Sequence, residues 1–141
     1  MGVWVGSIVF FSFVVAPTVF RVLSREDAAR LQRALFPLYY LVGIVCAAVG
    51  IVCVGTLLAD RAFGKWPGIL SLLLLAGMGG ADFWLRQTVV PQMARLRAQK
   101  DEGSASEAEW KALHRVSVQL NAAVLLAGLA LIFLLVYARV V

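Results

Sequence analysis

Charged residues are scarce in this chain of 141 residues, where Asp, Glu, Lys and Arg together make up 15%. A soluble domain carries about 25% charged and about 45–50% apolar residues, whereas 62% of this chain is hydrophobic. The scarcity of charge therefore excludes an ordinary soluble domain and indicates a membrane protein that crosses the bilayer several times. The length predicts a single domain, residues 1–141.

Histidine and cysteine are scarcer still, with one His and two Cys. A single histidine, His114, excludes a haem held by two histidines, whereas a haem with another axial donor stays open. Cys46 and Cys53 are seven residues apart, which on a helix separates their Cα atoms by about 10 Å, beyond the roughly 7 Å limit for a disulfide. That spacing is equally wrong for two thiolates on one metal ion, unless a ligand from another helix intervenes. We therefore expect no disulfide and no metal site, and the cofactor stays unknown.

Known catalytic motifs are also missing from the chain. It contains no phosphate-binding loop, nucleophile elbow or zinc-protease helix. The sequence therefore gives no support for an enzyme, and we predict that the protein is not one.

Long apolar runs are what the chain has instead, at residues 2–22, 38–59, 68–90 and 114–138. Each is close to the roughly 20 residues that a helix needs to cross a bilayer. Open sheet edges are not tolerated in lipid, so we predict an all-α fold, a bundle of four transmembrane helices. The last helix, expected over 107–139, and the third, with its extension over 92–100, exceed the bilayer thickness. The two should form a helical hairpin that protrudes from the membrane.

Several local signals refine these boundaries. Ser24 with Asp27 three residues later resembles a capping box, followed by a short amphipathic stretch. Proline disfavours helix in the residue before it, so Phe36-Pro37 predicts a boundary or a kink before the second span. Small residues at 76–80 predict a close approach of a neighbouring helix.

The basic residues indicate the orientation. Ten of the 13 Lys and Arg residues lie in the first and third connections or the adjoining span ends. The positive-inside rule then places those two loops in the cytoplasm and both termini outside, which suits a bacterial inner membrane. Because the net charge of +5 is explained by topology, we expect no nucleic-acid partner.

Most polar side chains associated with the spans are expected near the inner membrane face. The candidate ligand-binding residues are Tyr40, Asp82, Arg86, His114, Ser117 and Asn121. One interpretation is an inner polar pocket that handles a proton, an ion or an anionic headgroup, because ionisable groups within spans commonly mark such sites. The other is structural: Asp82 pairs with Arg86, His114 reaches the interface, and Asn121 hydrogen-bonds across helices.

Four short motifs together resemble the transmembrane protein 205-like family. They are Ala16-Pro17-x-x-Phe20, Leu35-Phe36-Pro37-x-Tyr39-Tyr40, Val90-Pro91-x-Met93-x-x-Leu96-Arg97 and Leu113-His114-x-x-Ser117-x-x-x-Asn121. That family is grouped by resemblance with copper-resistance-D-like four-helix membrane proteins, which include a haem-associated protoporphyrinogen oxidase. The resemblance implies a four-helix bundle and a role in metal or drug tolerance or in binding a redox cofactor. This chain differs from the redox relatives in having no second histidine.

Three functions stay open from the sequence. The first is a transporter-like or tolerance protein whose inner pocket binds a cation or a small solute. The second is a non-catalytic accessory subunit of a larger membrane complex, and the third is a haem- or quinone-associated redox protein. In each case the expected partners are the lipid bilayer and either further copies of this chain or other subunits.

Overall fold

The computed structural model describes residues 1–61, 63–98 and 104–140. Its elements are helical throughout: α1 (Gly2–Phe10), η1 (Phe11–Val15), α2 (Ala16–Val22), α3 (Arg25–Ala59), α4 (Lys65–Trp84), η2 (Leu85–Val89), α5 (Val90–Ala98) and α6 (Ser104–Val140). α1, η1 and α2 run on as one helix, and so do α4, η2 and α5. The resulting four helices are each long and apolar enough to cross a membrane. The predicted all-α fold with four helices long and apolar enough to cross a membrane is confirmed for the described residues.

α3 is longer than the second apolar run suggested. Its N-cap is Ser24, whose hydroxyl oxygen accepts the backbone N–H of Asp27 at 3.1 Å, so the helix start indicated by the resemblance to a capping box is confirmed. It then continues through Pro37 to Ala59 over 35 residues. Pro37 therefore does not end the helix. Membrane helices tolerate proline when neighbouring groups satisfy the backbone groups that it frees.

Two short π-helical segments interrupt the other long helices. η1 ends two residues before Pro17, and η2 ends two residues before Pro91. In each the residue after the segment donates its N–H to the carbonyl five residues back, Ala16 to Phe11 and Val90 to Leu85. Each segment therefore inserts one residue into an α-helix, a feature found frequently at functional sites.

The tightest packing in the fold lies between α3 and α4. A Cβ placed on Gly79 would lie 2.7 Å from the Cβ of Ala47, so the small-residue stretch at 76–80 allows close approach at this position. Gly77 and Gly80 have open space around them instead. The apolar core also takes residues from α1 and α6: Trp4, Ile8, Ala47, Val54, Leu75, Met78, Val124 and Leu131.

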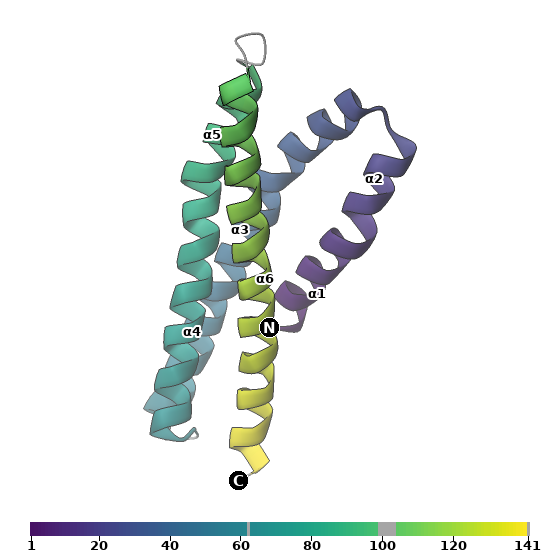
Figure 1. Ribbon diagram of the computed structural model, residues 1–141. Coiled ribbons are helices and arrows are strands. Elements are labelled where there is room, and N and C mark those ends of the chain that lie inside the picture. Colours follow the sequence, from purple (N-terminus) through teal and green to yellow (C-terminus); the bar gives the residue numbers. More distant parts are fainter. Residues whose placement is uncertain (62, 99–103, 141) are drawn as a thin grey trace.

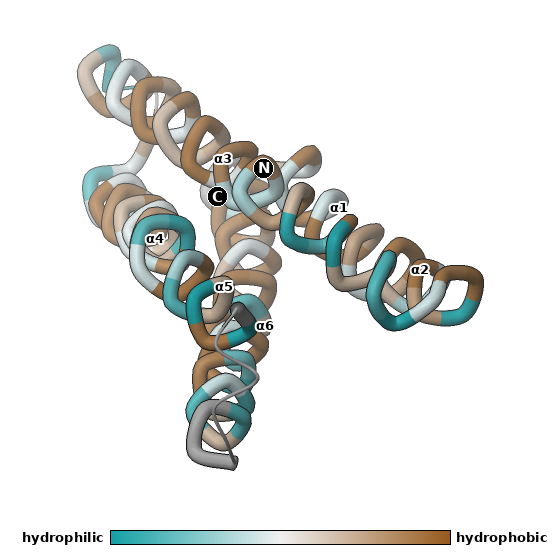
Figure 2. Tube along the Cα trace, turned by 90° about the horizontal axis from the view of Figure 1, so that it is seen from above, coloured by the Kyte–Doolittle hydropathy of each residue, from teal (hydrophilic) through white to brown (hydrophobic). Residues whose placement is uncertain are grey.

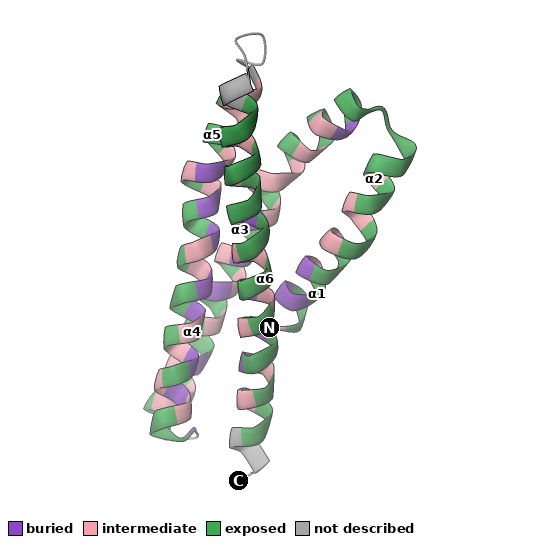
Figure 3. Cartoon of the chain, in the orientation of Figure 1, coloured by how far each residue is buried: buried purple, intermediate pink, exposed green. Residues whose placement is uncertain are grey.

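The first part of the chain diverges from the rest. α2 and residues 25–36 of α3, which we call the arm, slant away from α5 and α6 (Figure 1). Of the described elements, α2 contacts only η1 and α3. Figure 2 shows hydrophobic residues along the long helices and hydrophilic ones around α5, the start of α6 and the far end of α2. Buried positions follow α4 and η2, whereas α2 has none (Figure 3).

The predicted hairpin between the third and fourth spans is described only in part. α5 packs against α6, and the two helices lie side by side in Figure 1. The tip of the hairpin, residues 99–103, lies outside the described residues. α6 begins at Ser104, slightly before the start expected from the sequence.

Candidate functional site

Asp82 lies inside the helix bundle, on α4. It is only 2% exposed, and its Oδ1 atom has no hydrogen-bond partner. The indole N–H of Trp4, itself 1% exposed, donates to the carboxylate. A charge buried away from water is costly unless it is paired, so a carboxylate with one unpartnered oxygen marks this point as a candidate site.

A glycine makes room for this carboxylate. A Cβ on Gly43 of α3 would collide with Asp82 Oδ2 and would lie 2.8 Å from Trp4 Nε1. The first, second and third transmembrane helices therefore meet at one point, where Trp4, Gly43 and Asp82 are in contact. The sequence suggested Asp82 but neither partner, because nothing in an apolar run distinguishes these residues from ordinary packing residues.

Arg86 does not neutralise Asp82. Its Nε donates instead to the backbone carbonyl of Pro37 at 3.2 Å, and the ion pairs between described side chains do not include Asp82 with Arg86. The predicted intrahelical ion pair is therefore wrong. Arg86 belongs to η2, and the hydrogen bond of its guanidinium to Pro37 connects η2 to α3.

Two tyrosines connect α3 to α6 by hydrogen bonds. The Tyr39 hydroxyl donates to Asn121 Oδ1 at 2.7 Å, and the oxygens of Tyr40 and Ser117 are 3.1 Å apart. Tyr40 is 1% exposed and Ser117 is buried as well. Ser117 and Asn121 of α6 thus have partners on α3, and Asn121 forms the interhelical bond that the structural interpretation expected.

A groove lies beside these bonds, between α6 on one side and the first helix and α3 on the other. Its volume is about 400 Å³, within the roughly 300–1,000 Å³ range of small-molecule sites. The lining is mostly apolar and aromatic, with four of the six predicted site residues among it: Ile8, Phe11, Ser12, Phe13, Ala16, Phe20, Gln32, Phe36, Tyr40, His114, Ser117, Val118, Asn121, Ala122 and Leu125. The described residues that line it do not include Asp82 or Arg86. The expected single pocket is therefore divided into a groove and a buried carboxylate.

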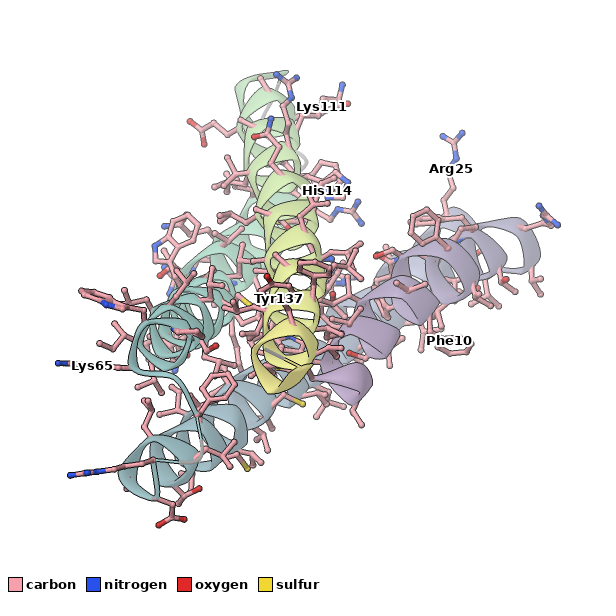
Figure 4. The ribbon with its side chains drawn as sticks, turned by 90° about the horizontal axis from the view of Figure 1, so that it is seen from below. Phe10, Arg25, Lys65, Lys111, His114 and Tyr137 are labelled. Carbon is pink, nitrogen blue, oxygen red and sulfur yellow. The ribbon has the colours of Figure 1, made fainter. Side chains whose placement is uncertain are left out.

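A smaller cavity of about 120 Å³ opens at the mouth of the groove and shares Phe20, Gln32, Phe36 and His114 with it. Here the rings of Trp110 and His114 stack at 5.1 Å, nearly parallel, and the guanidinium carbon of Arg97 lies 4.3 Å from the Trp110 ring centre. Figure 4 shows His114 on α6 and places Arg25 on the separate arm.

Sequence reasoning missed Arg97 and Trp110. The i, i+4 spacing of Trp110 and His114 would have placed them on one helix face. The contact with Arg97 depends on how α5 packs against α6, which the sequence does not reveal.

Metal ligands are not gathered in the part of the chain that the structure describes. Over residues 1–61, 63–98 and 104–140, no three His, Cys, Asp or Glu side chains come close enough to hold a metal ion. Cys46 and Cys53 are both free thiols.

Comparison with known proteins assigns the chain to a family. Residues 1–102 match the sequence profile described as "Domain of unknown function (DUF4149)". The chain belongs to the DUF4149 family. An uncharacterized protein of Aquifex aeolicus (strain VF5) is similar to it, with 34% identity over 133 residues that cover 92% of this chain and 86% of the relative. No solved structure matches the chain.

The DUF4149 match covers Asp82, Arg86 and both tyrosines, whereas the candidate residues on α6 lie beyond residue 102. Neither match carries the name of the transmembrane protein 205-like family or of the copper-resistance-D-like group. Those resemblances stay predictions.

Proposed function

We propose that this protein is a small integral membrane protein of the transporter-like or metal- and drug-tolerance type, and that its groove binds a small solute. The observation that carries the proposal is the groove itself, a concave site with aromatic walls and a few polar groups on one side. Such a lining is typical of small-molecule sites. The proposal assigns the protein no catalytic step.

Five of the six candidate residues have a role in this proposal, whereas Arg86 bonds to the Pro37 carbonyl and lies outside the groove. The hydroxyl of Tyr40, with Ser117 and Asn121, forms the polar wall, and these groups can exchange their present bonds for bonds to a solute. His114 contributes a further polar group at the mouth. Asp82, which is buried beside Gly43, is the candidate for a coupled proton or cation. Four helices enclose little volume, so transport would need a second copy of the chain.

The proposed topology places both termini outside a bacterial inner membrane, with the groove opening toward the cytoplasmic leaflet. The uneven distribution of Lys and Arg supports it, and on this topology α5 and the start of α6 protrude into the cytoplasm. A reporter that is active only in the cytoplasm should be inactive when fused to the C-terminus. Activity of that fusion would reverse the topology.

Solute binding can be tested on the purified protein. A bound solute raises the unfolding temperature, because a ligand at 100 times its Kd stabilises a protein by about 2.7 kcal/mol. Solutes that stabilise the wild type should stabilise Asn121→Leu much less. The control is Thr56→Val, because the Thr56 hydroxyl bonds to its own helix at Cys53. Equal stabilisation of Asn121→Leu and the control would contradict binding in the groove.

The biological role is tested in a deletion strain. Wild-type protein should restore the ion or drug tolerance that the deletion removes, and Asp82→Asn and His114→Ala should not. If both variants restore tolerance fully, Asp82 and His114 have no part in the function.

A second candidate, an accessory subunit of a larger membrane complex, is favoured by the arm. α2 contacts no described element other than η1 and α3, so most of its surface is free for another protein. Purification in a mild detergent should then recover partners in fixed ratio. A chain recovered alone or only with copies of itself would argue against an accessory subunit.

A further inference from the structure

The mouth of the groove has the chemistry of an anion site. We propose that it binds an anionic lipid, with the phosphate of the headgroup between Arg33 and Arg97 and an acyl chain lying in the groove. This inference rests on the proposed function, because it names the ligand class of the same groove.

Two cations converge at the mouth from different helices. Arg33 of α3 and Arg97 of α5 line the same cavity, and their charges are close enough to act on each other. Of the described residues that line this cavity, none is Asp or Glu. Guanidinium groups bind phosphate strongly and often in two-point fashion. A phosphate at this position would relieve the repulsion between the two arginines.

The guanidinium of Arg97 is held in place before any ligand arrives. It lies over the Trp110 ring at 4.3 Å, and that ring stacks in turn on His114. A cation over an aromatic face is stabilised by the ring quadrupole. Less side-chain entropy is then lost on binding, which favours affinity.

The cavity is apolar beneath these charges. Phe20, Phe36, Val90 and Met93 form much of its lining, and Phe20 and Phe36 continue into the larger groove. A phosphate alone would leave this apolar surface unused, whereas a ligand with a charged head and a hydrocarbon chain would use both parts.

The position of the charges along the helices also favours a lipid. Arg33 precedes the apolar run 38–59, Arg97 follows the run 68–90, and Trp110 precedes the run 114–138. All three therefore lie at the ends of the apolar segments, the level at which tryptophan and arginine meet lipid headgroups. A bilayer phospholipid presents its phosphate at this level and its chains toward the groove.

Lipid titration of the detergent-purified protein, followed by native mass spectrometry, tests the inference. Phosphatidylglycerol should bind at least about tenfold more tightly than phosphatidylcholine. The double variant Arg33→Gln with Arg97→Gln should lose this preference. The matched control is Arg30→Gln with Arg95→Gln, which removes two charges from the same helices: Arg30 pairs with Glu26 and Arg95 lines a different surface. The control should keep the preference.

The single variant Arg33→Gln serves if the double variant does not fold, because Arg33 is exposed, and it should weaken the preference severalfold. Equal losses in the double variant and its control would show non-specific attraction and overturn the inference. If millimolar inorganic phosphate competes as strongly as phosphatidylglycerol does, the inference is also overturned. The acyl chain of the lipid would then contribute nothing to binding.

The outcomes separate this inference from the proposed function. If both lipids bind equally and Asn121→Leu weakens both, the groove is a ligand site but the headgroup assignment is wrong. If Asn121→Leu leaves every lipid and solute unaffected, the groove itself is not a binding site and both proposals fail.

Discussion

The helices pack differently in two regions of the molecule, one with glycine contacts and one near the arm with aromatic contacts. Where α1, α3, α4 and α6 meet, glycines allow the helices to touch: a Cβ on Gly50 would lie 2.8 Å from Leu75, and one on Gly128 would lie 2.7 Å from Val5. Toward the arm, aromatic rings fill the space instead. The ring centres of Phe11 and Tyr39 are 4.8 Å apart, and those of Phe36 and Tyr40 are 6.1 Å apart. Phe11, Phe36 and Tyr40 line the groove.

The comparison shows how one small bundle can hold both a rigid part and a binding part. Helix association in lipid depends on close van der Waals packing, because no hydrophobic effect drives helices together there. The glycine contacts supply that packing at one end. At the other end, hydrogen bonds of Tyr39 and Tyr40 to α6 add to an apolar cluster that includes Leu85 and Val89, and a solute in the groove would have to replace those bonds.

The largest effect is expected from Gly43→Ala, which tests whether the glycine-packed end depends on close helix contact. The added Cβ meets the buried carboxylate of Asp82, so α3 and α4 must separate. We expect a loss of about 3 kcal/mol of unfolding free energy, at the upper end for overpacking, measured by denaturation in detergent. The control is Gly55→Ala on the same helix, where nothing lies within 4 Å; it should be neutral or slightly stabilising. Equal losses of unfolding free energy in the two variants would contradict a close contact between Gly43 and Asp82.

Trp4→Phe probes the same end through its hydrogen bond. The ring is largely kept, but the donor to Asp82 is lost and the carboxylate is left without its indole partner. We expect about 2 kcal/mol of destabilisation, as for an unsatisfied buried polar group, from the same denaturation curves. Trp66→Phe is the control, because Trp66 is 78% exposed. A loss no greater than that of the control would contradict a bond between Trp4 and Asp82.

A double-mutant cycle of Tyr39→Phe and Asn121→Leu measures how strongly one hydrogen bond holds α3 to α6 at the groove end. Their 2.7 Å bond should give a coupling of about 0.6 kcal/mol, the average for hydrogen bonds between membrane helices. This coupling energy is well below the loss of unfolding free energy expected for Gly43→Ala, because we expect the groove end to be held less firmly than the glycine-packed end. A coupling of several kcal/mol would show that the groove end is held as firmly as the other.

The smallest effect is expected in the arm. Glu26 and Arg30 form an i, i+4 ion pair at 3.0 Å with both side chains mostly exposed. A cycle of Glu26→Gln and Arg30→Gln should give about 0.3–0.5 kcal/mol, and salt should weaken it. Coupling above about 1 kcal/mol would mean that the arm is more enclosed than the structure indicates.

The sequence was sufficient for the architecture because the bilayer allows few solutions. Apolar runs near the required length predict membrane helices, and Ser24 before Asp27 correctly predicted the start of α3. Phe36-Pro37 was less informative, because a proline in a membrane helix does not necessarily end it.

The candidate site could be predicted only in part. The sequence indicates Ser117 and Asn121 as candidates, and its structural interpretation expects Asn121 to hydrogen-bond across helices. Both residues bond to tyrosines of α3. The pairing of Asp82 with Arg86 failed because the Arg86 guanidinium bonds instead to the Pro37 carbonyl of another helix, a contact that spacing along one helix does not reveal. Gly43 and Trp4 could not be identified, because their importance arises only when three separate helices meet.

The one-residue insertions at η1 and η2 bear on how relatives of this protein should be aligned. Losing one residue there would restore a plain α-helix and rotate everything beyond it by about 100°. A single gap at 11–15 or 85–89 would thus mark a change in which side chains face the bundle. In such a relative, identity beyond the gap would not imply the same contacts, and residues matching Phe20 or Met93 would point elsewhere.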